Sequence, residues 1–264
     1  MTPLKPRCAA LWLAAALLPL PAAAARLLIF GEQHDQPDQQ RQVAAEVQAL
    51  AGRGQLAAVV LEMAEQPLRT SALPRDASES AVRDALKWKG WPWEPYAAVV
   101  MNAVRAGVPV LGGNLPRANL RTAMADAALD DRVDEDTRAV LTDAVRSGHC
   151  DLLPASQQPG MVRIQIARDQ AMARVAADAV RAAPPDGTVL LLAGAQHASR
   201  DRGVPLHLAR IDATLPVRVV MFGEASSSLV ADERRPALVA PQDDHCEALR
   251  KQLATPPAAS AASR

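Results

Sequence analysis

Acidic residues and histidines that could take part in chemistry follow three apolar runs of the sequence. The run 27–31 is followed by Glu32 and His34, the run 56–61 by Glu62, and the run 188–194 by His197. Carboxylates and imidazoles together can transfer protons or bind a divalent transition metal. The candidate set for such chemistry is Glu32, His34, Glu62, Arg168, Asp169 and His197. Within it, Glu32, His34, Glu62 and His197 are the candidate metal ligands.

The elements that must position these side chains alternate along the chain. Apolar runs at 27–31, 56–63, 108–114, 188–194 and 217–224 are typical of buried strands, and the segments 38–50, 94–106 and 161–182 repeat apolar residues at helical spacing. This alternation predicts an α/β fold with a mainly parallel sheet flanked by helices. Asn114 and Glu224 also follow predicted strands, and ligands bind at the carboxyl ends of such strands.

Arg168 and Asp169 are placed differently, because they fall inside the apolar stripe of the predicted helix 161–182. Burying an ion pair costs several kcal/mol per ion, roughly, unless other groups solvate it. We therefore expect both residues to meet the polar side chains at the strand ends. A lone histidine, such as His207 or His245, is more simply a satisfied loop or core residue. A polar network that only fixes the strand order would also explain the whole set.

Composition limits the functional classes and the domain plan. The 264 residues carry 29 basic and 29 acidic side chains, which does not suit a nucleic-acid-binding protein. The sequence predicts a single α/β domain over 26–235, with a helical subdomain from about 64–95 and 117–160. The segment 236–264, rich in Pro, Ala and Ser, is expected to be a partly disordered tail.

The N-terminal segment 1–25 has two basic residues, an apolar stretch and several small residues, which is the pattern of a cleaved signal peptide. We therefore expect a periplasmic protein. Cys8 precedes the apolar stretch, so it does not fit a lipid-anchored cysteine. Cys150 and Cys246 then remain as an even pair, which predicts a disulfide in an oxidising compartment.

Large rings are concentrated in one short segment that holds Trp88, Trp91, Trp93 and the single tyrosine, Tyr96. These rings could line a flat hydrophobic ligand, and tyrosinate can bind ferric haem iron. Anchoring a helical segment on the core is an equally good explanation from composition.

Six motifs in order resemble the ChaN-like haem-binding uptake proteins: 31–35 (Gly-Glu-Gln-His-Asp), 61–63, 91–96, 113–117, 167–173, and 194–197 with 203–205. The resemblance implies an exported bacterial protein that binds haem and takes part in haem and iron acquisition. It also implies a homodimer on haem binding and an outer-membrane haem receptor or uptake system as partner. The iron ligand it implies is a tyrosine, here Tyr96, assisted by a histidine, for which His197 and His34 are the choices.

The same family is similar to the Tiki and TraB proteins, in which related motifs are linked to metal-dependent peptide cleavage. The alternative is therefore a metal-dependent hydrolase that uses Glu32, His34, Glu62 and His197 around a divalent transition metal, with Arg168 stabilising negative charge. The chain departs from many relatives in having no lipoprotein cysteine after its apolar segment, which favours a soluble periplasmic form.

Overall fold

The computed structural model describes residues 24–223, 228–241 and 244–254. In this part of the chain six strands form one sheet in the order β3-β2-β4-β1-β5-β6, and each neighbouring pair is parallel. The predicted α/β fold with a parallel sheet is thus confirmed. The strands are β1 (Arg26–Glu32), β2 (Leu56–Glu65), β3 (Val110–Asn114), β4 (Thr188–Gly194), β5 (Val217–Phe222) and β6 (Glu233–Arg235).

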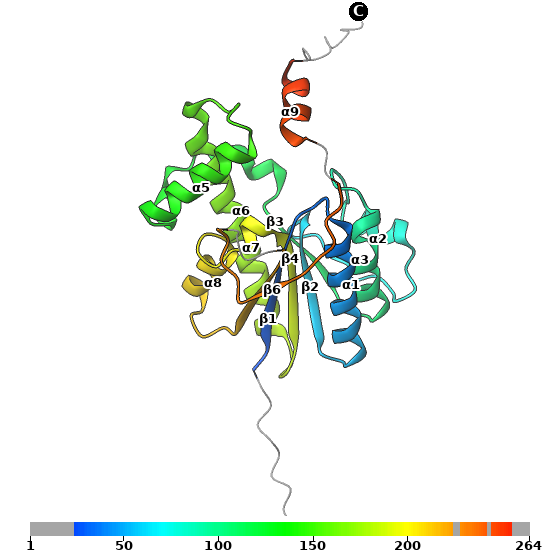
Figure 1. Cartoon of the computed structure of the whole chain (residues 1–264). Helices are drawn as coiled ribbons and strands as arrows, with labels where there is room; N and C mark the ends of the chain where they lie inside the picture. Colours follow the sequence, from blue (N-terminus) through cyan, green and yellow to red (C-terminus); the bar gives the residue numbers. More distant parts are fainter. Residues whose placement is uncertain (1–23, 224–227, 242–243, 255–264) are drawn as a thin grey trace, which may run out of the picture.

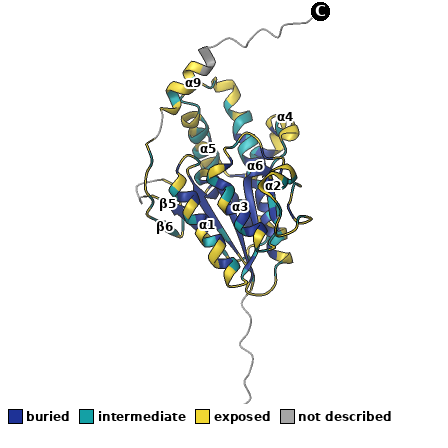
Figure 2. Ribbon diagram, turned by 90° about the vertical axis from the view of Figure 1, so that its right-hand side faces the viewer, coloured by how far each residue is buried: buried dark blue, intermediate teal, exposed yellow. Residues whose placement is uncertain are grey.

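Helices cover both faces of the sheet, because successive strand residues point to opposite faces. Phe30 packs with α1 (Pro37–Gly52) and α3 (Glu94–Arg105) on one face. Its neighbour Ile29 packs on the other face, with α6 (Gln158–Ala182) and α8 (Val204–Ile211). Figure 1 shows these layers on either side of the strands, and Figure 2 shows that the sheet and the inner helix surfaces are buried.

A third apolar core lies in a helical subdomain at the carboxyl ends of the strands (Figure 1). Its buried side chains include Leu129, Leu141 and Ile166. The subdomain is built from η1 (Arg117–Asn119), α4 (Leu120–Ala125), η2 (Ala127–Arg132), α5 (Glu135–Gly148), η3 (Ala155–Gln157) and the first half of α6. The stretch 64–95 packs elsewhere: α2 (Glu79–Ala85) contributes Val82 to the core of the α1 and α3 face.

The C-terminal segment is attached at two places. Residues 236–241 run beside the start of α1, where the Ala240 N–H donates to the Gln36 side chain at 2.7 Å. Further on, α9 (His245–Ala254) is joined to the end of α5 by the disulfide between Cys150 and Cys246, which confirms the predicted pairing. Residues 1–23 of the predicted signal peptide, and Glu224, lie outside the described residues. No helix within the described ranges is long and apolar enough to span a membrane.

Candidate functional site

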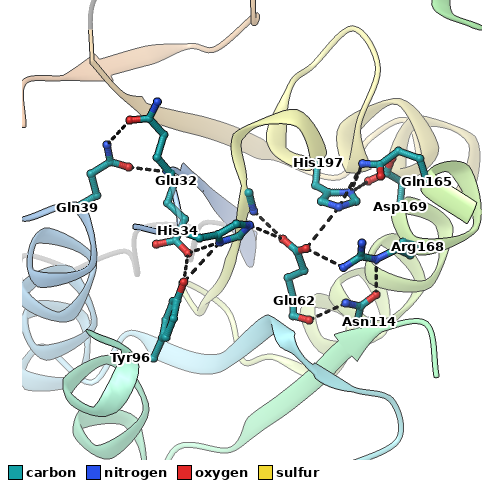
Figure 3. Close-up of polar contacts among 12 residues, drawn as sticks. Glu32, His34, Gln39, Glu62, Tyr96, Asn114, Gln165, Arg168, Asp169 and His197 are labelled. Carbon is teal, nitrogen blue, oxygen red and sulfur yellow. Dashed lines mark hydrogen bonds and ion pairs between the residues drawn. The ribbon is translucent and has the colours of Figure 1, made fainter. Parts of the chain in front are cut away.

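The polar residues that follow the strands meet in one cluster at the carboxyl edge of the sheet (Figure 3). β1 ends at Glu32, β2 carries Glu62 near its end, and β3 ends at Asn114. β4 is followed by the short helix α7 (Ala195–Ala198), which carries His197. The neighbouring order of β3, β2, β4 and β1 brings these four strand ends together, so residues far apart in sequence share one site.

Glu62 is the centre of the cluster, and only 2% of it is exposed. Arg168 donates to its Oε1 at 2.9 Å, and the Gly194 backbone N–H donates to its Oε2 at 2.7 Å. His197 Nε2 lies 3.4 Å from Oε1 and His34 Nε2 lies 3.9 Å from Oε2. A buried carboxylate with this many donors is held in its ionised form.

His197 is fixed between two carboxylates. Its Nδ1 lies 2.6 Å from Asp169 Oδ1, while Nε2 faces Glu62. Asp169 is fully buried on α6, one position from Arg168, as the apolar stripe of this helix predicts. Gly203 is required beside the backbone of α7, because a Cβ there would lie 2.0 Å from the His197 carbonyl oxygen.

Glu32, His34 and Tyr96 form the second half of the cluster. His34 Nδ1 lies 3.0 Å from Glu32 Oε1, and the Tyr96 hydroxyl donates to the same oxygen at 2.8 Å. Gln40 donates to Glu32 Oε2 at 2.5 Å. About a third of the His34 side chain, 34%, stays exposed, whereas the Glu32 side chain is fully enclosed.

Burial and charge shift the pKa values in opposite directions. Burial alone would raise the pKa of Glu62, but His197, Arg168 and His34 lower it below its ordinary value. Burial opposes protonation of His197, yet Glu62 and Asp169 raise its pKa above the ordinary value. Burial also raises the pKa of Asp169 to about 6, against the effect of His197. The two carboxylates thus favour the protonated, cationic form of His197.

In the Glu32 half of the cluster, the neighbouring groups offset the effect of burial on the carboxylate less completely than they do at Glu62. Burial raises the pKa of Glu32, although hydrogen bonds from His34, Tyr96 and Gln40 act against the rise. Burial would lower the pKa of His34, but the neighbouring Glu32 and Glu62 carboxylates raise it. Burial, followed by the adjacent Glu32 charge, raises the pKa of Tyr96 far above its ordinary value. Tyr96 is thus held as a neutral phenol.

A cleft of about 520 Å³ opens beside this cluster, within the range of small-molecule sites. We call it the Trp91 cleft. Glu62, Asn114 and Arg168 lie at its inner end, and Trp91 forms one wall and contacts His34 at a ring-centroid distance of 4.6 Å. Three basic residues, Lys87, Lys89 and Arg117, form its rim together with one carboxylate, Glu65, which lies 3.8 Å from Arg117. The remaining lining is apolar or glycine: Met63, Ala64, Leu68, Leu86, Gly90, Leu115, Leu120, Met161 and Ile164.

The cluster does not have the arrangement of a metal centre. Within the described ranges, no group of three or more His, Cys, Asp or Glu side chains is placed to hold a metal ion. The physical reason is that Arg168 already supplies the positive charge on Glu62, and Asp169 is taken up by His197. The divalent metal of the hydrolase alternative therefore has no support in this geometry.

The structure brings together all six candidates named for acid–base chemistry, and Asn114 with them. Tyr96 also joins the cluster, through Glu32. Two glutamines were missed: Gln40 on Glu32, and Gln165, whose side-chain nitrogen lies 2.9 Å from His197 Nδ1. Helical spacing could have identified both. Gln40 shares the buried stripe of α1, and Gln165 precedes Arg168 by one turn of α6.

Comparison with known proteins agrees with this fold. A solved structure of ChaN from Campylobacter jejuni, with cofacial heme binding, has a TM-score of 0.66 and 23% identity, and the match covers 78% of this chain and 84% of that one. The type III effector HopBA1 has a TM-score of 0.48 and 17% identity, with 78% and 82% covered. No curated protein matches. The family described as "Haem-binding uptake, Tiki superfamily, ChaN" matches residues 20–208. Since that match spans most of the sequence, the chain belongs to the ChaN family of haem-binding uptake proteins.

Proposed function

We propose that this protein binds haem in the Trp91 cleft and presents His34 to the iron. The observation that carries the proposal is the position of His34. Its ring is oriented by Glu32 and contacts Trp91, which lines an apolar cleft that also has Lys87 and Lys89 in its wall. Haem is a flat apolar ring with two carboxylate side chains. The cleft offers surfaces for both parts.

The lining of the cleft fits such a ligand by chemistry. Leu68, Leu86 and Ile164 offer apolar surface to the ring. Lys87 and Lys89 at the rim offer charges for carboxylates. Burying apolar ring surface contributes about 25 cal/mol per Å². Each charge pair at an exposed rim contributes up to about 1 kcal/mol. Such pairs also orient the ligand, and reversing the rim charges adds repulsion.

His34 fits the role of iron ligand better than the other imidazole of the cluster. The Glu32 carboxylate at its Nδ1 fixes the ring and increases its basicity, which is the usual support for a metal-bound histidine. Its Nε2 faces Glu62 only at 3.9 Å. His197, by contrast, is 7% exposed at its side chain and has carboxylates beside both ring nitrogens.

Tyr96 does not fit the role of iron ligand in the conformation described. The residue is 0% exposed, its hydroxyl donates to Glu32, and its raised pKa opposes the tyrosinate form. Tyr96 instead supports His34 indirectly, because both groups share Glu32 Oε1. Movement of the Trp88–Trp93 segment would be needed before the phenol could reach a ligand in the cleft.

The test is a titration of the purified protein with hemin, followed by the Soret absorbance. The wild type should give a saturable change. Lys87→Glu with Lys89→Glu, which reverses charge at the rim, should weaken binding by about tenfold or more, or about 1.4 kcal/mol. The matched control is Arg26→Glu with Arg53→Glu, since Arg53 follows the last turn of α1 and Arg26 opens β1, away from the site. No saturable change, or equal losses in both double variants, would contradict the proposal.

We further propose that the protein is exported to the periplasm, acts in haem and iron acquisition with an outer-membrane receptor or uptake system, and dimerises on haem binding. The charged and apolar pattern of residues 1–25 supports export, and the disulfide suits an oxidising compartment. Mass measurement of the protein from a periplasmic extract should give a chain that starts near Arg26. Size-exclusion chromatography with and without hemin tests dimerisation.

A further inference from the structure

Helix α6 packs against α8 (Figure 1). Residues of these two helices line a second groove, on the other side of α6 from the Trp91 cleft. Its volume is about 260 Å³. It shares no lining residue with the Trp91 cleft. We call it the arginine groove, and its walls are Arg132, Gln170, Arg174, His207, Arg210 and Ile211.

Three of the groove-lining residues are arginines from different elements. Arg132 comes from η2, Arg174 from α6 and Arg210 from α8, and none of them forms an ion pair or hydrogen bond with another residue of the described ranges. Other arginines of the same subdomain are paired, as Arg163 is with Asp130 at 2.7 Å. Like charges gathered in one groove repel each other, which makes the groove a strong attractor for an anion.

The floor of the groove carries a buried histidine with unused hydrogen-bonding capacity. His207 is 3% exposed, and its Nε2 is shielded from solvent and has no hydrogen-bond partner in the described structure. Burial, together with the charges of Arg210, Arg174 and Arg132, lowers the pKa of His207 to about 4. A neutral imidazole surrounded by three cations can donate one hydrogen bond to an anion without adding a charge.

One acidic residue, Asp134, interacts electrostatically with Arg210 of the groove. Asp134 also caps α5 by accepting from the Thr137 N–H at 2.8 Å. The pKa of Asp134 is lowered first by the hydrogen bond with the Thr137 side chain, then by the Thr137 backbone N–H, and also by Arg210, so it stays ionised. Its Oδ1 is engaged at the helix start. The three guanidinium groups thus present a net positive, donor-rich surface.

We propose that the arginine groove binds a phosphate group. Guanidinium groups suit the oxygens of phosphate because they offer paired donors in a plane. Three of them, with the Gln170 amide and the His207 imidazole, surround one small site from three different elements. The phosphate can be free in solution or belong to a lipid headgroup that the outer surface of α6 and α8 meets.

The first experiment measures inorganic phosphate binding by calorimetry, in the full chain and at constant ionic strength. The wild type should bind saturably, and Arg174→Gln and Arg210→Gln should each weaken binding by about tenfold. Arg105→Gln is the matched control, because Arg105 is an exposed arginine on α3, on the opposite face of the sheet. These exposed substitutions leave the cores intact.

A second readout follows the His207 ring by NMR during a pH titration. Phosphate should raise the pKa of His207 from about 4, because a bound anion offsets the three guanidinium charges. The shift should be absent in Arg174→Gln with Arg210→Gln.

A third experiment measures co-sedimentation of the protein with lipid vesicles, and it compares phosphatidylglycerol vesicles with phosphatidylcholine vesicles.

The two arms separate the sources of phosphate. Saturable calorimetric binding identifies free phosphate, while sedimentation only with phosphatidylglycerol, lost in the arginine variants and kept in Arg105→Gln, identifies a headgroup. Absence of binding in both arms, or an equal loss in Arg105→Gln, would overturn the proposal.

Discussion

Glu62 shows how a single residue can stay charged inside a protein. Desolvation of a fully buried carboxylate favours protonation, yet Arg168, His197 and the Gly194 N–H hold it ionised. Removing one partner from such a network costs more than the interaction itself contributes, because the other charge is left buried. The cluster therefore behaves as one electrostatic unit and fixes the positions of the residues beside the cleft.

The imidazole of His197 should make stability depend on pH. Its pKa is raised in the folded state, so its stabilising contribution is complete below the unfolded value of about 6.5 and is lost as pH rises through the folded value. The pKa of Asp169 is also raised, from 3.8 to about 6, so stability falls as the pH rises through this lower range as well. The Tm of the wild type should therefore fall as the pH rises above about 6.5.

The matched variant for this prediction is His197→Gln with Asp169→Asn, which removes both titrating groups and keeps similar shapes. Thermal denaturation across the same pH series should give a smaller slope for this variant. His34 contributes a slope of the same sign to both proteins, so the difference between them isolates the pair. Parallel curves would show that His197 is not held as a cation.

Gly194 controls the space around His34. A Cβ at this position would lie 2.8 Å from His34 Nε2 and 3.4 Å from Glu62 Oε2. Gly194→Ala should therefore displace the imidazole and weaken hemin binding about tenfold, while the Tm changes little. Gly148→Ala is the control, because a Cβ there meets nothing within 4 Å. Unchanged hemin affinity in Gly194→Ala would separate His34 from the haem site.

At the scale of elements, α6 connects all parts of the molecule. Its first half packs in the helical subdomain through Val162 and Ile166, and its second half covers the sheet through Met172 and Ala176. Between these halves it carries Gln165, Arg168 and Asp169 to the cluster. The 3.6-residue spacing of its apolar residues predicted this helix. Because Arg168 and Asp169 fall within the apolar stripe, which is the face that meets the core, the same spacing predicted that both point inward.

Other elements were beyond sequence reasoning. β6 is three residues long, Glu-Arg-Arg, and has no apolar pattern. It joins the sheet edge through backbone pairing with β5, a contact that side-chain periodicity does not report. Likewise the stretch 64–95 carries little regular pattern, and its place against α1 and α3 depends on Val82, Leu86 and Trp88 finding an apolar surface formed by distant segments.

The disulfide should hold the C-terminal segment rather than the whole fold. A crosslink that closes a loop of 96 residues stabilises a cooperative fold by about 4–5 kcal/mol in the chain-entropy treatment. Apart from the disulfide, however, α9 makes few contacts with the described chain, such as the approach of His245 Nε2 to the Gly148 carbonyl at 3.2 Å.

Cys150→Ser with Cys246→Ser should therefore cost the core less than about 1 kcal/mol, while cleavage by an added protease in 236–254 becomes faster. Chemical denaturation measures the first quantity, and mass spectrometry of the fragments measures the second. If the free energy of unfolding instead fell by the full loop-closure value of about 4–5 kcal/mol, the tail and the core would unfold together.

At the scale of the whole molecule, the fold and the convergence of the site could be predicted, but its internal pairing could not. Parallel strands end at one edge, so Glu32, Glu62, Asn114 and His197 were expected to meet. Which oxygen faces which donor depends on strand order and on helix placement. The placement of Tyr96 against Glu32, deep beneath Trp91, is such a detail, and the sequence signalled only that a phenol lay near indoles.

The central claim is that His34, supported by Glu32, faces the iron of haem in the Trp91 cleft. The most direct measurement is the absorption and resonance Raman spectrum of the hemin complex for the wild type, His34→Ala and Tyr96→Phe, with His245→Ala as the surface control. The account predicts that His34→Ala loses the iron–imidazole signature, while Tyr96→Phe and His245→Ala keep it. An iron–phenolate signature that disappears in Tyr96→Phe and survives in His34→Ala would contradict it.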